Sequence, residues 1–248
     1  MQATVYGLAA SHPTRAAELM LEYKGIEHKR RDLLNVLHRP MLRAMGFPGK
    51  SVPAVKLEGH KVQTTRALAR ELDRLVPEPP LFPADADRRT AVEAAEKWGD
   101  EQLQPIPRRL SWAALKRDGS GLRSFMDGPI MGIPAGLAAK TATPFVYGSV
   151  RLNKATDDNV RVDLISLPGM LDQVDDLIAN GVIGGERPNA ADFQIFTSVR
   201  LLMCFDDLRA ELDGRPAAVK AQQLVPYYPG RVPPVFPAEW LLSAPAAA

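Results

Sequence analysis

A cluster of four prolines between residues 77 and 83 divides this chain of 248 residues into two unlike parts. Proline fixes the backbone φ angle and has no amide hydrogen, so this stretch favours a stiff, extended connector. Short strand-like and helical patterns alternate before it, whereas long helical patterns without a clear strand follow it. We therefore predict an N-terminal domain at 1–77, a proline-rich linker at 78–85 and an all-helical domain at 86–225.

The first part predicts the element order βαβαββα, which is the thioredoxin-like order. Apolar runs, turn residues and helix caps indicate each element. The expected elements are a strand at 3–7, a helix from Pro13 that ends at Gly25, a strand at 26–33, a loosely helical piece at 34–45, strands at 54–57 and 61–63, and a helix capped by Thr64 or Thr65 that Val76-Pro77 ends.

The second part predicts long helices. One is expected at 88–115, with Pro105 and Pro107 kinking or interrupting it, and another from 158 to 179 with an interruption at Pro168. Because the stretch 127–151 is rich in glycine and proline, we expect little regular structure there.

A capping box predicts the start of a core helix near residue 190. Asn189 can accept an amide hydrogen bond, and Asp192 can accept one from the amide of Asn189. A strongly apolar run follows these residues. The proline-rich tail at 226–248 contains Tyr227, Tyr228, Phe236 and Trp240, which predict that part of the tail packs back on the body.

Composition excludes several classes of protein. The 31 basic and 29 acidic residues give a net charge of +2, too little to attract nucleic acid or an anionic membrane. No apolar run approaches the roughly 18 residues that span a bilayer, and the first residues show no charged start followed by an apolar signal core. The only cysteine, Cys204, lies in an apolar run and predicts a buried, inert thiol, with no disulfide and no metal site. We expect a cytoplasmic protein without nucleic-acid or membrane partners.

Three separate segments of the chain carry a resemblance to a known family. They are Ser11-His12-Pro13-Thr14, Gly49-Lys50-Ser51-Val52-Pro53-Ala54-Val55 and Lys61-Val62-Gln63-Thr64-Thr65-Arg66-Ala67-Leu68. Together with the capping box they resemble bacterial members of the glutathione transferase superfamily, of the serine type. The resemblance implies a thioredoxin-like domain followed by a helical domain, glutathione as co-substrate or cofactor, and a homodimer.

Ser11 is the expected catalytic residue. A hydroxyl at the start of a helix can donate a hydrogen bond to a bound thiol, and the helix dipole adds to this stabilisation of the thiolate, which is the reactive nucleophile. The alternative is that Ser11 only caps the helix. His12 is a candidate to assist proton transfer, although a lone histidine beside a cap is more often solvated.

The resemblance assigns thiol binding to two further segments. Val52, before a cis Pro53, would pair its backbone with the cysteinyl part of the ligand, whereas a lone Val-Pro would be an ordinary trans bond. Thr64 and Thr65 stand where the family receives the γ-glutamyl carboxylate at a helix N-terminus. Thr64 replaces the usual Glu or Gln and has no carboxylate for the ligand's ammonium group. For both threonines, simple helix capping is the alternative.

Lys50, Arg66 and His38 are candidates to hold the terminal carboxylates of glutathione, with solvated surface charges as the alternative. Trp98, Trp112 and Met131 are candidates to line an acceptor pocket, although aromatic residues at helical spacing are more often core.

The implied reaction is attack of the activated thiolate on an electrophilic small molecule, by conjugation, by thiolytic cleavage of an ether or halide, or by isomerisation. The residues leave two alternatives to this reaction open. Loss of the acid at Thr64 favours either a non-catalytic binding module with this fold or an enzyme that uses a thiol other than glutathione.

Overall fold

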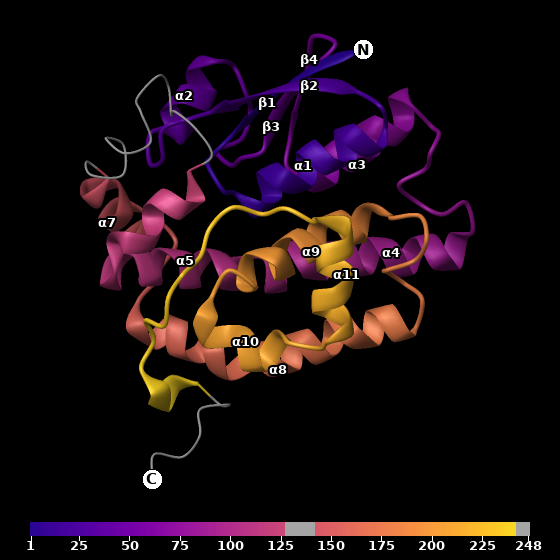
Figure 1. The fold of residues 1–248 in the computed structure, drawn as a ribbon. Coiled ribbons are helices and arrows are strands. Elements are labelled where there is room, and N and C mark those ends of the chain that lie inside the picture. Colours follow the sequence, from indigo (N-terminus) through magenta and orange to yellow (C-terminus); the bar gives the residue numbers. More distant parts are fainter. Residues whose placement is uncertain (127–141, 242–248) are drawn as a thin grey trace.

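The computed structural model describes residues 1–126 and 142–241. A four-stranded sheet with its helices forms one layer, and a body of helices forms the other (Figure 1). Helices α1 and α3 lie between the sheet and the helical body, while α2 lies at one end of the sheet (Figure 1).

The thioredoxin-like order predicted from the sequence is confirmed. The elements are β1 (Gln2–Gly7), α1 (His12–Tyr23), β2 (Glu27–Asp32), α2 (His38–Ala44), β3 (Ala54–Leu57), β4 (His60–Gln63) and α3 (Thr65–Leu75). The sheet order is β2-β1-β3-β4. Strands β1 and β2 are parallel, and β3 is antiparallel to both β1 and β4. This topology brings the end of β1 and the start of β3 together beside the start of α1.

Local chemistry explains where α1 and α3 begin and end. Ser11 caps α1 and a proline occupies its first turn, where no amide hydrogen is needed. Gly25 follows α1 with φ +67°, in the left-handed region that commonly ends a helix. Thr64 caps α3. These are the residues that the sequence indicated for the same roles.

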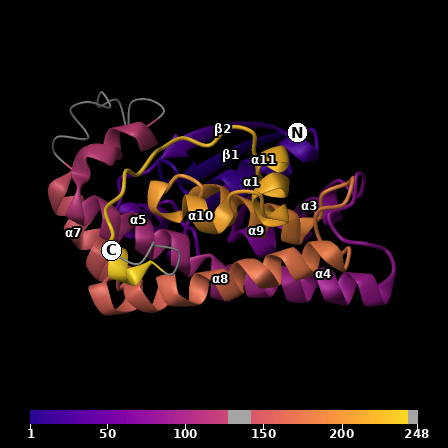
Figure 2. The ribbon, with the colours of Figure 1, turned by 60° about the horizontal axis from the view of Figure 1, so that its bottom comes forward.

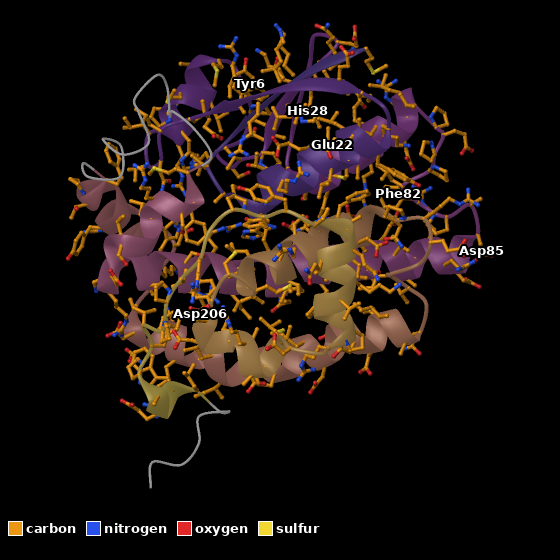
Figure 3. The ribbon with its side chains drawn as sticks, viewed as in Figure 1. Tyr6, Glu22, His28, Phe82, Asp85 and Asp206 are labelled. Carbon is orange, nitrogen blue, oxygen red and sulfur yellow. The ribbon has the colours of Figure 1, made fainter. Side chains whose placement is uncertain are left out.

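A buried lysine, Lys24, holds the linker against the sheet layer through hydrogen bonds. The Nζ atom of Lys24 donates to Asp73 Oδ1 at 2.6 Å, to the Val76 carbonyl at 2.7 Å and to the Pro79 carbonyl at 2.6 Å. Phe82, labelled in Figure 3, lies under the guanidinium groups of Arg70 and Arg89. The Val52–Pro53 and Glu78–Pro79 bonds are both cis.

The helical domain contains long helices, as predicted. Its described elements are α4 (Ala86–Trp98), a π-helical turn η1 (Gly99–Leu103), α5 (Pro105–Arg117), the 3₁₀ segment η2 (Gly119–Phe125), α7 (Thr143–Leu152), α8 (Asp157–Ala179), α9 (Ala190–Leu202), η3 (Asp206–Leu208), α10 (Arg209–Leu212), α11 (Pro216–Leu224) and η4 (Ala238–Trp240). Figure 2 shows α8 running along the helical layer. The break between α4 and α5 comes directly before Pro105, where the sequence placed an interruption.

Two sequence expectations in this domain were wrong. Helix α8 continues through Pro168 instead of being interrupted there. Within 127–151, residues 143–151 belong to α7, although little regular structure was expected. Proline in the first turn of α7 costs no hydrogen bond. A Cβ at Gly148 would lie 3.0 Å from Val36 Cγ2, so the glycine permits close packing rather than marking a loop. Residues 127–141 lie outside the described part.

Helix α9 is the core helix that the capping box predicted. Every residue of α9 except Arg200 is buried. The Asn189 side chain accepts from the amides of Ala191 at 2.9 Å and Asp192 at 3.3 Å. Asp192 in turn accepts from the amides of Asn189 at 2.7 Å and Gly184 at 2.5 Å. The box therefore fixes the start of the helix on which both layers pack.

The tail packs back in part, as predicted. Tyr228 and Phe236 are buried, whereas Tyr227 is 69% exposed. Asp206, labelled in Figure 3, pairs with Arg231 at 2.8 Å and fastens the tail to the end of α9. Among the described residues, no helix is both long and apolar enough to cross a membrane.

We expect Asn189→Ala to lower the free energy of unfolding by about 1–2 kcal/mol, because the Ala191 amide loses its acceptor and the Asp192 amide keeps only the backbone carbonyl of residue 189. Urea unfolding measures this change. Asn189→Ser keeps a capping oxygen and should show a clearly smaller loss. Equal losses for the two variants would contradict a capping role.

Asp192 also predicts a pH dependence of stability. Burial raises the pKa of its carboxyl to about 6, against the hydrogen bonds from Asn189 and Gly184 that lower it. The folded state then holds a proton that the unfolded state releases between about pH 4 and pH 6, so stability falls as pH rises through this window. Relative to Asp192→Asn, the unfolding free energy of the wild type should fall by on the order of 2 kcal/mol from pH 4 to pH 6 and change little above pH 7. A constant difference would refute the buried proton.

Candidate functional site

A cleft of about 730 Å³ opens where the two layers meet at the N-terminus of α1. Its walls come from the loop at 8–11, the loop at 48–52, and from α2, α5 and α7, which lie at the same end of the molecule in Figure 1. A cleft of this volume suits a small organic ligand. It brings together six residues singled out from the sequence: Ser11, His12, His38, Lys50, Val52 and Trp112.

Ser11 stands at the N-terminus of α1 and lines the cleft. Its Oγ accepts from the Thr14 amide at 3.4 Å, a long contact that leaves the hydroxyl hydrogen available to another acceptor. The preceding Ala10 has φ +53°, which is uncommon for a residue with a side chain. The Tyr228 hydroxyl donates to the Ala10 carbonyl at 2.6 Å, so the tail supports this loop.

Gln63 holds the loop that forms the facing wall. Its Oε1 accepts from the Gly49 amide at 2.6 Å, and its Nε2 donates to the Ser51 carbonyl at 2.7 Å. Lys50 and Val52 on this loop line the cleft. Among the described residues, no group hydrogen-bonds to the Val52 amide or carbonyl. The sequence reasoning missed Gln63, although a polar residue that ends a strand just before a helix cap is a usable signal.

Pro53, Thr64 and Thr65 lie beside this loop and are not among the residues that line the cleft. Thr64 is exposed, its amide donates to the Pro53 carbonyl at 3.1 Å, and its φ of +77° is strained for a β-branched residue. The Thr65 hydroxyl is buried and donates to Gln194 Oε1 on α9 at 2.5 Å. This hydroxyl therefore holds α3 to α9 instead of facing a ligand.

The basic candidates have different surroundings. Burial and the neighbouring Arg39 lower the pKa of His38, so its imidazole is neutral near pH 7. Lys50 is exposed at the cleft. Arg66 lies 3.7 Å from Glu96 Oε2 and 3.7 Å from Glu101 Oε1, and these carboxylates already balance its charge.

His12 corrects one sequence expectation, because it is only 2% exposed rather than solvated. Burial and the nearby Arg108 hold its pKa well below the usual value, although the Gln104 backbone acts in the opposite direction. His12 is therefore neutral at pH 7. It forms part of the cleft floor beside Ser11 and does not supply a positive charge.

The far end of the cleft is mostly apolar. Trp112 lines it together with Leu115, Phe125 and Phe145. Trp98 packs against the core elsewhere, and Met131 lies outside the described residues. Arg108 also lines this end, and the sequence reasoning missed it, although its four-residue spacing from Trp112 places both on one face of α5.

In the described part of the chain, no group of three or more His, Cys, Asp or Glu residues is placed to hold a metal ion. Burial raises the pKa of the Cys204 thiol to about 12, in line with the expected inert cysteine.

Comparison with known proteins agrees with this geometry. Residues 5–80 match the family model of the glutathione S-transferase N-terminal domain. The sequence matches no curated protein significantly.

Solved structures share the fold at low sequence identity. A glutathione S-transferase from Sinorhizobium meliloti has 16% identity and a TM-score of 0.63, over 90% of this chain and 88% of that one. One from Rhodospirillum rubrum has 16% identity and a TM-score of 0.60, over 90% and 87%. Maleylacetoacetate isomerase from Anaeromyxobacter dehalogenans, with glutathione bound in its active site, has 17% identity and a TM-score of 0.53, over 90% and 89%. Residues 5–80 thus match a glutathione S-transferase N-terminal domain, and the chain shares the overall fold of these solved structures.

Proposed function

We propose that this protein is a glutathione-dependent enzyme in which Ser11 activates the thiol of bound glutathione for attack on an electrophilic small molecule. The observation that carries the proposal is the Ser11 hydroxyl, which lies at the N-terminus of α1 and opens on a cleft with polar and apolar ends. A neutral donor at a helix N-terminus is suited to stabilise a sulfur anion.

In the proposed reaction, the glutathione thiol loses its proton to solvent and the Ser11 hydroxyl donates to the resulting thiolate. The sulfur then forms a bond to an electrophilic carbon of the acceptor. In a substitution or thiolytic cleavage the leaving group departs with the bonding electron pair, whereas in an isomerisation the sulfur adds and later leaves. All three reactions need the same activated thiolate, and the acceptor decides among them.

The wall opposite Ser11 would hold the peptide part of glutathione. The backbone amide and carbonyl of Val52, without partners among the described residues, are suited to pair with the cysteinyl part. Thr64 would meet the γ-glutamyl end through its exposed hydroxyl, which accepts from the Ala67 amide and can still donate its hydrogen. Lys50 supplies a positive charge for a terminal carboxylate, and neutral His38 can offer a hydrogen bond to it.

A second candidate has support from the same wall. Thr64 has no carboxylate for an ammonium group, the Thr65 hydroxyl is bonded to Gln194, and Arg66 is paired with two glutamates. These features favour a thiol without a γ-glutamyl group, or a module that binds a ligand without catalysis. We also propose, from the family resemblance, that the protein works as a homodimer in the cytoplasm.

Calorimetry with reduced glutathione, alongside the ultraviolet absorbance of the bound thiolate, tests the proposal. Ser11→Ala should raise the thiol pKa of bound glutathione by about one to two units, because a hydrogen bond to a charged sulfur is lost. The value of kcat/KM with an electrophilic acceptor should fall at least about tenfold.

Ser111→Ala is the matched control for this measurement. Ser111 also lines the cleft, but its hydroxyl already donates to the Pro107 carbonyl at 2.8 Å. The thiol pKa should therefore not change in this variant. Absence of glutathione binding at millimolar concentration would overturn the assignment of glutathione and favour the second candidate.

Gln63→Ala should weaken glutathione binding about 5- to 30-fold, because the loop with Lys50 and Val52 loses both of its side-chain hydrogen bonds. The thiol pKa of the bound ligand should stay near the wild-type value, since Ser11 is untouched. Lys56→Ala, an exposed change on β3, serves as control. Wild-type affinity in Gln63→Ala would show that the loop keeps its shape without Gln63.

A further inference from the structure

Arg108 is a cation in the part of the cleft lined by α5, and among the described residues it has no carboxylate partner. It is partly buried and lines the cleft together with Ser111, Trp112 and Leu115. These residues follow at i, i+3, i+4 and i+7, so one face of α5 presents them to the same space. The face is otherwise suited to an apolar ligand.

The hydrogen bonds of Arg108 orient its charge without neutralising it. Its Nη2 donates to Gln104 Oε1, and Gln104 Nε2 donates to Asp100 Oδ1 at 2.7 Å. Within residues 1–126 and 142–241, no carboxylate lies within ion-pair distance of this guanidinium. Burial lowers the pKa of Arg108, only partly offset by the more distant Asp100.

Arg109, the next residue of α5, has a structural role. Arg109 forms a two-pronged ion pair with Asp163 of α8, with Nε to Oδ2 at 2.6 Å and Nη2 to Oδ1 at 2.5 Å. Arg108 has the same planar guanidinium, but among the described residues only its Nη2 has an acceptor, so its other donors can meet a ligand in the cleft. Placing a guanidinium against apolar walls is costly unless an anion meets it.

We propose that the cleft takes an acceptor with an apolar, preferably aromatic, body and a carboxylate, and that Arg108 binds the carboxylate. The apolar body would lie against Trp112 and Phe145, within reach of the sulfur that Ser11 activates. This substrate class rests on the proposed function for its reaction, but the carboxylate site itself does not. Arg108 would thus select among electrophiles by charge.

Equilibrium binding of two non-reactive probes of the same shape tests the site without any thiol. Calorimetry with dinitrobenzoate and dinitrobenzamide should give a Kd at least about tenfold lower for the carboxylate in the wild type, as expected for a charge-assisted pair. Arg108→Met should remove this preference while leaving the Kd for dinitrobenzamide within about twofold of its wild-type value. Arg108→Lys should retain part of the preference for the carboxylate, because the lysine ammonium keeps the positive charge but lacks the two-pronged donor geometry of the guanidinium.

Lys116→Met is the control for net charge. Lys116 is an exposed residue of the same helix outside this cleft, and its replacement should leave the preference at the wild-type value. Equal affinity of the wild type for the two probes, or a preference that survives in Arg108→Met, would overturn the proposal. If Arg108→Met does not fold, the ratio of the two Kd values in the wild type and in Arg108→Lys tests the proposal. Equal Kd values in the wild type, or an undiminished preference in Arg108→Lys, would then overturn it.

Kinetics with glutathione then separate this proposal from the proposed function. The kcat/KM ratio of chlorodinitrobenzoate to chlorodinitrobenzamide should fall at least about tenfold in Arg108→Met, with KM for glutathione unchanged. If the protein prefers the carboxylate probe in binding but does not turn over glutathione, the Arg108 carboxylate site is supported and the proposed reaction is refuted. If the protein turns over glutathione but shows no preference for the carboxylate, the proposed reaction is supported and the Arg108 site is refuted.

Discussion

The burial of α9 is the constraint on which the rest of the structure depends. A helix that is apolar on nearly every face must be covered on all sides. Helices α1 and α3 cover it from the sheet layer, while α4, α5 and α11 cover it from the helical layer. The Thr65–Gln194 hydrogen bond crosses this interface inside the core. The position of α1 against α9 sets where Ser11 meets the helical domain.

The cleft follows from the different chemistry of its two sides. The thioredoxin-like domain contributes backbone groups and polar residues, which are suited to a peptide-like ligand. Helix α5 contributes Trp112 and Leu115, with Arg108 as the single charged residue on that face in the described structure. One side thus presents backbone and polar groups, while the other presents apolar side chains and an arginine.

The sequence predicted what local signals determine. Proline and glycine positions, caps and periodicity were sufficient for the element order, for α9 and for the role of Ser11 as a helix cap. The expectation of little regular structure at 127–151 was wrong for α7, because a proline in its first turn costs no hydrogen bond and Gly148 serves close packing against Val36. Gln63 and Arg108 were missed because their roles depend on contacts between distant segments. The partner of the Thr65 hydroxyl is 129 residues away along the chain, which no local pattern indicates.

The hydrogen bond from Tyr228 to the Ala10 carbonyl joins the two ends of the described chain next to Ser11. Burial keeps this phenol neutral by raising its pKa well above the usual value, so the bond persists across the physiological pH range. Domains fold during synthesis from the N-terminus onward. On the ribosome, the elements from β1 to α11 can therefore form before the loop at Ala10 receives its support, because Tyr228 emerges after all of them.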